Sequence, residues 1–380
     1  MRLHCITFFV KPHTMKRVFA CIILAVCLQV AQKPIKEKTI ISSVSPVKNL
    51  FIITIDGFRW QELFTGADSS IINDERYTRD TSTMNMMYWA PTPQERRKKL
   101  MPFFWNVLVN KGQIYGNRSF RNKVNTSNFY SLSYPGYNEI FTGNTDIAVA
   151  SNDKKTNPNK NVLEHLNQET NYKRNVVAFT SWNVFPFILN TVRSGIKMNS
   201  GYQNLEVDNN KTQSLVNKVE NDGVYNKTET RHDQLTFVTA KEYITRFQPS
   251  IVYLGFGETD EMAHLGRYDL YLEKAAAIDK MIAELWHWVQ SNQGYKDNTT
   301  FIITTDHGRG GSSSTWVDHG LLVNGSSQTW LVLIGPNITP LGEMKNDGQL
   351  YQKQIAQTIA TLVGENFKSN KSIAPPIALK

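Results

Sequence analysis

The feature that most constrains this chain is a pair of apolar runs, each followed directly by side chains that bind metal ions. Residues 49–55 lead into Asp56, and residues 301–305 lead into Asp306 and His307. Continuous runs of β-branched and aromatic residues are typical of interior strands in a parallel sheet. Open parallel sheets carry their functional groups at the carboxyl ends of such strands. The two runs therefore predict an α/β enzyme with a metal site at one edge of its sheet.

Strand and helix patterns alternate along the rest of the chain. Strand patterns cover 175–180, 251–256 and 329–334, and helix patterns cover 93–108, 161–168, 268–290 and 351–363. This alternation predicts a mostly parallel central sheet with helices on both faces. Two polar stretches, about 66–100 and 194–235, are predicted to be peripheral insertions.

The first 32 residues are predicted to be a secretory signal. Lys16 and Arg17 precede an apolar run, Val18 to Leu28, that is too short to cross a bilayer. An N-terminal membrane anchor is the alternative. We expect a linker over 33–47 and a catalytic domain over 48–380. We also expect export to the periplasm or the extracellular space, without stable membrane association once the signal is removed.

Composition and charge limit the chemistry of the mature chain. All three cysteines, Cys5, Cys21 and Cys27, fall in the predicted signal, so we expect no disulfide and no thiolate metal ligand. The formal charge of +9 falls to about +5 without the four basic residues of the signal. The remaining Lys and Arg residues are scattered and do not form the basic stripe of a nucleic-acid-binding protein, so we expect no specific nucleic-acid binding.

Further candidate ligands lie between and after the two strand ends. Asp260 and His264 are four residues apart, which places both on one face of a helix, although a surface ion pair has the same spacing. His319 follows Asp318, and we nominate only the histidine because neighbouring side chains diverge. With Asp56, Asp306 and His307, these residues are enough for two zinc-like ions.

Each strand-end motif also has a purely structural interpretation. Asp56 could serve as a turn or cap residue, and Asp306 with His307 could form a capped turn. The glycines that follow favour the metal site, because we expect them to leave open space around an ion. They are Gly308, Gly310 and Gly311.

The segment 128–143 supplies a hydroxyl that such a site could activate. Ser133 precedes Tyr134-Pro135-Gly136 and a helix pattern. This places it at a helix N-terminus, where the dipole and free N–H groups favour an alkoxide and an incoming phosphate. Ser131 is the runner-up, and a simple N-cap is the structural alternative for Ser133.

The order of these motifs resembles that of the alkaline phosphatase superfamily, and within it the nucleotide pyrophosphatase/phosphodiesterase branch. The resemblance spans about Asn49 to Val363. It implies one zinc ion held by Asp260, His264 and His319. It implies a second zinc ion held by Asp56, Asp306 and His307, with Ser133 as the nucleophile beside it. It also implies an asparagine that donates to the phosphate, for which Asn152 is our match and Asn157 the rival.

The chain departs from relatives of this fold at two positions. The superfamily more often has threonine at the nucleophile position, and it often has histidine where Tyr137 stands. Sulfatases carry arginine at the position of Tyr137, and cofactor-independent mutases carry a larger inserted domain that is not evident here.

The resemblance therefore implies zinc-dependent hydrolysis of a small phosphate ester or nucleotide-like substrate through a phosphoserine. The segment 179–185 offers aromatic residues for a pocket but no Lys-x-Arg pair, which favours diesters over monoesters. The alternatives are a sulfatase-like or mutase-like enzyme of the same fold, or a non-catalytic, metal-stabilised binding protein. The oligomeric state is not predicted.

Overall fold

The structure is a computed structural model that describes residues 45–205 and 211–379. The predicted signal with its three cysteines lies outside these residues. Within the described ranges, none of the helices has the length and apolar character needed to cross a bilayer. Val47, at the end of the predicted linker, is buried and donates its N–H to Leu362 O.

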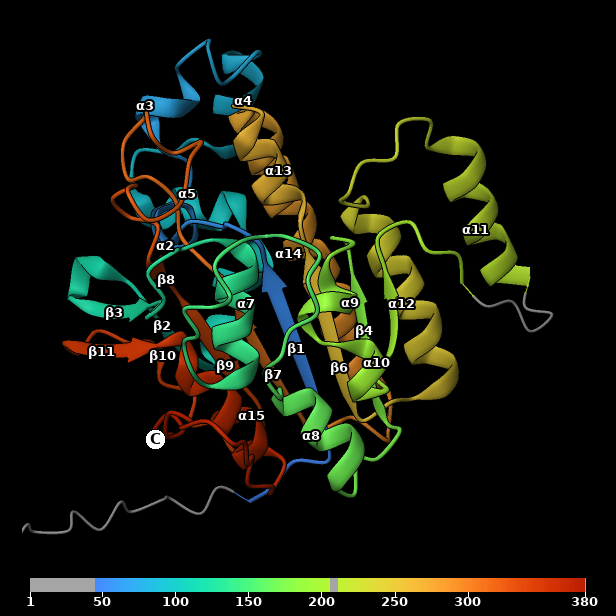
Figure 1. Ribbon diagram of the computed structural model, residues 1–380. Coiled ribbons are helices and arrows are strands. Elements are labelled where there is room, and N and C mark those ends of the chain that lie inside the picture. Colours follow the sequence, from blue (N-terminus) through green and yellow to red (C-terminus); the bar gives the residue numbers. More distant parts are fainter. Residues whose placement is uncertain (1–44, 206–210, 380) are drawn as a thin grey trace, which may run out of the picture. The chain divides into compact units, whose positions relative to one another are not determined.

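An eight-stranded sheet forms the centre of the described chain (Figure 1). Its strands follow the order β10 (Gly342–Glu343), β2 (Gly112–Tyr115), β9 (Leu331–Ile334), β7 (Thr299–Thr304), β1 (Asn49–Ile55), β6 (Ile251–Phe256), β4 (Val176–Thr180) and β5 (Lys197–Ser200). The five strands from β7 to β5 are parallel, whereas β9 pairs antiparallel with both β7 and β2. The prediction of a mostly parallel α/β sheet is confirmed.

Strand β1 shows why the sheet is covered on both faces. Alternate side chains point to opposite faces of a strand. Phe51 and Ile53 accordingly belong to one apolar core, and Leu50 and Ile52 belong to the other. The first core includes residues of α6 (Pro102–Asn106), α12 (Asp233–Phe247) and α14 (Tyr268–Ser291). The second includes residues of α7 (Ser133–Thr142), α8 (Val162–Glu169) and α15 (Ile355–Leu362).

The two predicted insertions contain regular structure. The first holds α3 (Ser69–Ile72), α4 (Thr81–Tyr88) and α5 (Pro93–Leu100), after α2 (Trp60–Thr65). The second holds α11 (Lys211–Gly223), but it also holds β5, which is an edge strand of the central sheet. Sequence reasoning missed β5 because this short, partly exposed edge strand lacks a continuous apolar run. The remaining elements are α9 (Phe185–Ile188), α10 (Thr191–Ser194), α13 (Glu258–His264) and a small sheet of β11 (Gly348–Tyr351), β3 (Asn122–Asn125) and β8 (Gln328–Thr329).

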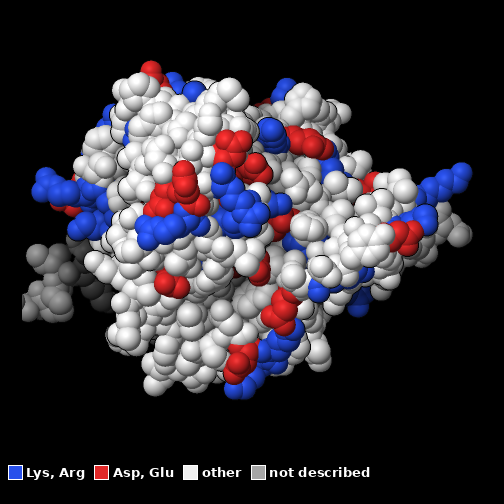
Figure 2. All heavy atoms as spheres, turned by 90° about the horizontal axis from the view of Figure 1, so that it is seen from above, with Lys and Arg blue, Asp and Glu red and all other residues white. Residues whose placement is uncertain are grey.

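Charged side chains of both signs are interspersed on the face shown in Figure 2. Lys and Arg residues lie next to Asp and Glu residues there and form no continuous basic stripe on that face.

Candidate metal centre

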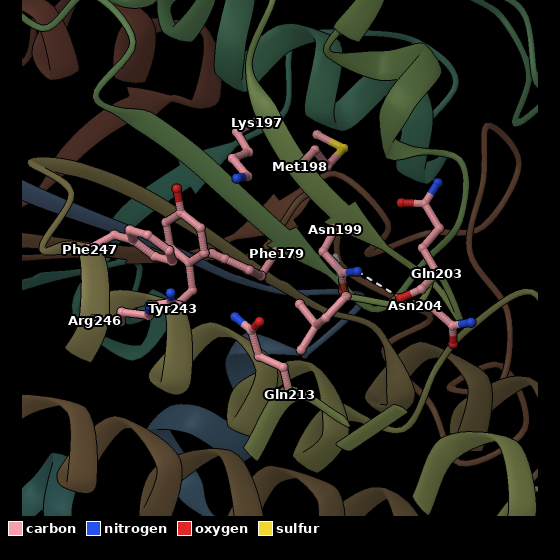
Figure 3. Close-up of a pocket in the computed structure, with 11 residues that line it drawn as sticks. Phe179, Lys197, Met198, Asn199, Gln203, Asn204, Gln213, Tyr243, Arg246 and Phe247 are labelled. Atoms are coloured by element: carbon pink, nitrogen blue, oxygen red, sulfur yellow. Dashed lines mark hydrogen bonds between the residues drawn. The ribbon is translucent and has the colours of Figure 1, made fainter. Parts of the chain in front are cut away.

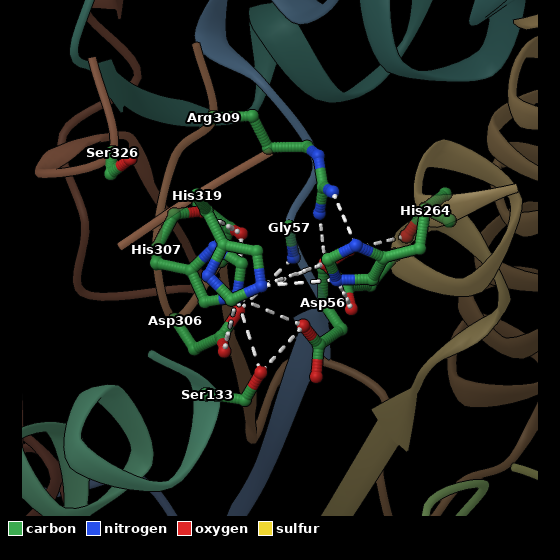
Figure 4. A network of polar contacts seen from close by, with 12 residues as sticks. Asp56, Gly57, Ser133, His264, Asp306, His307, Arg309, His319 and Ser326 are labelled. Carbon is green, nitrogen blue, oxygen red and sulfur yellow. Dashed lines mark hydrogen bonds and ion pairs between the residues drawn. The ribbon is translucent and has the colours of Figure 1, made fainter. Parts of the chain in front are cut away.

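The carboxyl ends of β1 and β7 bring three predicted ligands together. The strands are parallel and in register, with Thr54 beside Thr304, so the residues that follow them emerge at the same edge. Asp56, Asp306 and His307 are all buried. His307 Nε2 lies 3.4 Å from Asp56 Oδ1 and 3.4 Å from Asp306 Oδ2 (Figure 4). We call these three residues the inner group.

The other three predicted ligands form an outer group of Asp260, His264 and His319. Asp260 and His264 lie on α13, and His264 Nε2 is 3.1 Å from Asp260 Oδ2. The same nitrogen is 3.1 Å from His319 Nε2. The two groups meet at Asp260 Oδ1, which lies 3.8 Å from the Nε2 atoms of both His307 and His319. All six predicted side chains therefore converge, and their role as metal ligands stays a prediction.

The Ser133 hydroxyl lies against the inner group. Ser133 Oγ is 3.1 Å from His307 Nε2 and 3.4 Å from Asp56 Oδ1. Ser133 is the first residue of α7, and the N-cap residue is Leu132, which makes no side-chain cap bond. The hydroxyl is therefore not used to cap the helix, and the alternative that Ser133 is an N-cap is wrong.

The start of α7 differs from the sequence prediction in one respect. The Tyr134 N–H is not free, because it donates to Asn152 Oδ1 at 3.0 Å, and Pro135 has no N–H. Gly136 allows the helix to approach the strand end, since a Cβ there would lie 2.5 Å from Asp306 O. Close packing rather than a set of free amides thus positions Ser133.

Ser131, the runner-up, contributes its main chain. Its carbonyl accepts a hydrogen bond of 2.9 Å from His319 Nδ1, and its φ of 47° is in the left-handed region. The Ser131 N–H donates to Asn128 Oδ1 at 2.9 Å. Ser131 therefore orients an outer ligand, whereas Ser133 presents its hydroxyl to the inner group.

The donor set fits metal ions. His307 Nδ1 donates to Gly308 O, and His319 Nδ1 donates to Ser131 O, both at 2.9 Å. Since each proton is on Nδ1, both Nε2 atoms present a lone pair to the carboxylates. Asp306 Oδ2 is buried and has no hydrogen-bond partner among the described residues. A buried, unpartnered carboxylate oxygen facing imidazole lone pairs is what a cation site requires.

Burial and mutual repulsion shift the pKa values in this site. Burial, aided by the charge of Asp260, raises the pKa of Asp56 to about 7. Burial and the charges of Asp56 and Asp260 raise the pKa of Asp306 well above its usual range. Burial lowers the pKa of His307 to about 4 and, with the neighbouring His307, that of His319 to about 3. The imidazoles of His307 and His319 are thus neutral near pH 7, which is the form that binds metals. The hydrogen bond with Asp260 instead raises the pKa of His264.

Arg309 is part of the site, and sequence reasoning missed it. Its buried guanidinium donates from Nε to Trp316 O at 2.9 Å and from Nη2 to Val317 O, and Nη1 pairs with Asp260 Oδ1. Burial opposes the negative charge of Asp260, but Arg309 holds the pKa of this carboxyl well below its usual range. The sequence did offer a signal for this role, because Arg309 directly follows the candidate ligands in Asp306-His307-Gly308.

Two kinds of glycine shape the site. Gly57 has a φ of +58°, and a Cβ there would lie 2.5 Å from Asp260 Oδ1, so glycine is required where β1 ends. The expected open space is wrong at Gly308 and Gly310, whereas a Cβ at Gly311 would meet only Gln61 Nε2, at 3.8 Å. A Cβ at Gly308 would lie 2.3 Å from Gln328 O, and a Cβ at Gly310 would lie 2.1 Å from Thr315 O. These two glycines let backbone segments pack together behind the ligands.

The helix that carries Asp260 and His264 is held by a reciprocal cap. Asp233, at the start of α12, accepts from the N–H groups of Gly257 and Glu258 at 2.9 and 3.1 Å. Glu258, at the start of α13, accepts from the Asp233 N–H at 2.8 Å. Each helix therefore supplies a carboxylate to the N-terminus of the other, which fixes α13 next to α12.

A cavity of about 230 Å³ opens onto the site. It is lined by Asp56, Ser133, Asn152, Trp182, Glu229, Thr230, Gly257, Asp260, Glu261 and His264. Asn152 is thus beside Ser133, whereas Asn157 is buried and donates to Asn138 Oδ1. None of the described lining residues is Lys or Arg. Lys154 lies nearby, but its Nζ is 2.6 Å from Glu229 Oε1.

The aromatic residues of 179–185 separate into three environments. Trp182 lines the site cavity, as the sequence suggested. Phe179 lines a different cavity of about 240 Å³, with Tyr243, Phe247 and Lys197 among its other residues (Figure 3). Phe185 packs in the core against Tyr137, whose hydroxyl donates to Asp56 Oδ2 at 3.0 Å. The tyrosine at the position where the superfamily often has histidine therefore orients an inner ligand.

The chain is similar to one protein-family model and to several solved structures. Residues 60–320 match the family model of the Metalloenzyme superfamily, and no curated protein sequence matches the chain. Among solved structures, wild-type alkaline phosphatase PafA is 11% identical with a TM-score of 0.60, over 88% of this chain and 99% of that one. The phosphonate monoester hydrolase SpPMH from Silicibacter pomeroyi is 12% identical with a TM-score of 0.52, over 83% and 73%. The lipoteichoic acid synthase LtaP from Listeria monocytogenes is 11% identical with a TM-score of 0.53, over 86% and 74%.

Proposed function

The chain belongs to the Metalloenzyme superfamily, and on that premise we propose that it is a zinc-dependent hydrolase of phosphoric esters. The observation that carries the proposal is the convergence of the Ser133 hydroxyl with the inner and outer groups at one sheet edge. The likeness in fold to an alkaline phosphatase and a phosphonate monoester hydrolase supports it. Export to the periplasm or the extracellular space is a further proposal that rests only on the sequence of residues 1–32.

Each group of ligands would hold one zinc ion. Asp56, Asp306 and His307 would hold the inner ion, and Asp260, His264 and His319 would hold the outer ion. Zinc in such a site acts as a Lewis acid that polarises a phosphoryl oxygen and stabilises the charge on the entering and leaving oxygens. The mixture of neutral imidazole and carboxylate ligands suits zinc.

The protein side chains supply the nucleophile, hold the candidate ligands in position and donate a hydrogen bond to the phosphate. Ser133 loses its hydroxyl proton to solvent as Oγ attacks phosphorus, the bond to the leaving oxygen breaks, this oxygen takes a proton from solvent, and a phosphoserine forms. Water then attacks the same phosphorus and releases Ser133. Tyr137 and Ser131 O hold Asp56 and His319 in position through the bonds described above. Because Asn152 Oδ1 accepts from Tyr134, its amide nitrogen is the group left to donate to a phosphate oxygen.

The charges of the cavity favour a phosphodiester. A monoester carries a second negative charge near pH 7, and the described lining has no Lys or Arg to receive it. Glu261 and Glu229, the latter paired with Lys154, line the cavity instead, so a second negative charge on the substrate would be repelled by carboxylates, chiefly that of Glu261. A diester carries a single charge and avoids this repulsion.

The test is hydrolysis of three p-nitrophenyl compounds by zinc-loaded protein. We expect bis-p-nitrophenyl phosphate to be hydrolysed faster than p-nitrophenyl phosphate, and p-nitrophenyl sulfate to be hydrolysed slowest. A chelator should abolish turnover and zinc should restore it. Faster turnover of the sulfate would favour a sulfatase-like enzyme, and full activity in verified metal-free protein would contradict the mechanism.

A further inference from the structure

Exposed apolar side chains gather beside the outer group. Among the described residues, eight large apolar side chains are more than 60% exposed. Five of these lie on segments that carry a candidate ligand or are connected to one by hydrogen bonds. The five, which we call the apolar rim, are Phe129 (72% exposed), Ile147 (76%), Leu265 (67%), Leu321 (63%) and Leu322 (95%). Single exposed apolar residues are ordinary, but several on segments that adjoin a candidate site indicate a binding surface.

Hydrogen bonds connect the segments that carry the rim. Leu265 follows His264 directly, and Leu321 comes shortly after His319, whose Nε2 lies 3.1 Å from His264 Nε2. His319 in turn donates to the carbonyl of Ser131, two residues after Phe129.

The fourth segment, which carries Ile147, is connected to the segment of Phe129 through Tyr130, the residue after Phe129. The Tyr130 hydroxyl donates to Ile147 O at 2.8 Å. A Cβ at Gly320 would lie 3.9 Å from Tyr130 O, so the loop that carries Leu321 and Leu322 passes beside the same segment. Three segments of the rim therefore lie beside the outer group, and the segment of Ile147 adjoins one of them through Tyr130.

We propose that the apolar rim binds an alkyl or acyl chain of the substrate, which makes the substrate class an amphiphilic phosphodiester. This inference rests on the proposed function. Its second support is the contrast between the rim and the cavity, whose lining is mostly polar or acidic and includes no Lys or Arg. A singly charged phosphate fits inside, and its apolar substituent leaves water by lying across the rim.

The experiment uses alkyl p-nitrophenyl phosphate diesters with methyl, butyl and octyl chains, each below its critical micelle concentration. With zinc-loaded protein, kcat/KM is expected to rise on the order of 50-fold from methyl to octyl, because added methylenes are partly removed from water. The paired substitution Phe129→Ser with Leu322→Ser should bring the octyl value close to the methyl value. Val192→Ser is the matched control, because Val192 is 97% exposed on α10, which packs against α8. It should leave the chain-length series unchanged.

A binding measurement separates this inference from the proposed function. Calorimetric titration of zinc-loaded protein with octyl methylphosphonate and methyl methylphosphonate should show tighter binding of the octyl ester. Equal binding would overturn the inference even if every diester is hydrolysed. Tighter octyl binding without any hydrolysis would support the rim and contradict the hydrolase.

Other occupants of the rim give different results. If the octyl preference survives the paired substitution, another surface holds the chain and the inference is overturned. If wild-type protein binds phosphatidylcholine vesicles, the paired variant does not, and the ester series is flat, the rim docks on a membrane and the inference is likewise overturned.

Discussion

The inner and outer groups use similar side chains but are held in different ways. The inner residues follow two central strands directly, so the packing of the sheet fixes them, and all three are buried. The outer residues lie on a short helix and a loop, and 44% of the His264 side chain is exposed. The outer group depends on neighbours such as Arg309 and the reciprocal cap. The inner group also has supporting contacts, such as the bond from Tyr137 to Asp56, but its position in the buried sheet adds a constraint that the outer helix lacks.

The largest expected effect tests whether the nucleophile belongs to the inner group. Ser133→Ala should lower kcat by three or more orders of magnitude, because the attacking oxygen is lost. Zinc content should stay at two ions per chain, since all six ligands remain. Steady-state kinetics and metal analysis check this, and trapping at low pH should label Ser133. A phosphoryl group on Ser131 would show that the assignment of the motif is wrong.

Substituting one ligand from each group should separate the two ions. His264→Ala should leave one zinc ion tightly bound in the inner group, while Asp306→Asn should remove the inner ion. Both should lower kcat/KM by at least about 100-fold, since loss of even a supporting partner commonly costs 10- to 100-fold. Competition with a chromophoric chelator measures the number and affinity of the ions. Loss of both ions from His264→Ala would show that the groups do not bind independently.

Removing Arg309 should affect the metal-free protein more than the zinc-loaded protein. Arg309→Gln leaves the carboxylate of Asp260 without its partner, which should lower the free energy of unfolding of the metal-free protein by about 3 kcal/mol. Bound zinc should reduce this loss because it also neutralises Asp260. Urea unfolding with and without zinc provides the measurement, and Arg309→Lys should recover part of the stability. Equal losses in both states would argue against a link between Arg309 and the outer ion.

The smallest effect concerns the reciprocal cap. Glu258→Gln should cost about 1 kcal/mol of stability, as loss of a helix cap does. It should weaken the outer zinc ion a few-fold and leave the inner ion unchanged, because only α13 shifts. Asp279→Asn is the matched control, since Asp279 accepts from the N–H groups of Phe103 and Phe104 at the start of α6, on a different helix. It should lower stability without changing zinc affinity.

The inner group could be predicted from the sequence because its signals are local. The buried strand runs end at Asp56 and Asp306, and the pairing of parallel strands brings their ends together. Asp260 and His264 were readable from helical spacing. Arg309, the apolar rim and the reciprocal cap were not predicted, because their partners are distant in sequence. Asp233 and Glu258, for example, are both common helix-start residues, and only tertiary packing pairs them.

Some errors came from residues whose local preference is ambiguous. Gly308 and Gly310 indicated open space, but glycine also permits close backbone packing, and the structure uses them in that way. The edge strand β5 lacks the continuous apolar run of the central strands and was read as part of an insertion. In both cases the tertiary packing around the residues, and not their local sequence, determined the structure.

The central position of β1 also sets the order in which the site can form during synthesis. β1 pairs with β6 and β7, whose residues Ile251 and Thr299 pair with Leu50 and Asn49 near the start of the described chain. The ribosome therefore delivers the first ligand long before the strands that position it. Contacts so distant in sequence form late in folding because the closure of long loops costs entropy. The six candidate ligands are all present only after His319 has emerged, so we expect the two proposed ions to bind after most of the chain has been made and not to its nascent N-terminal half.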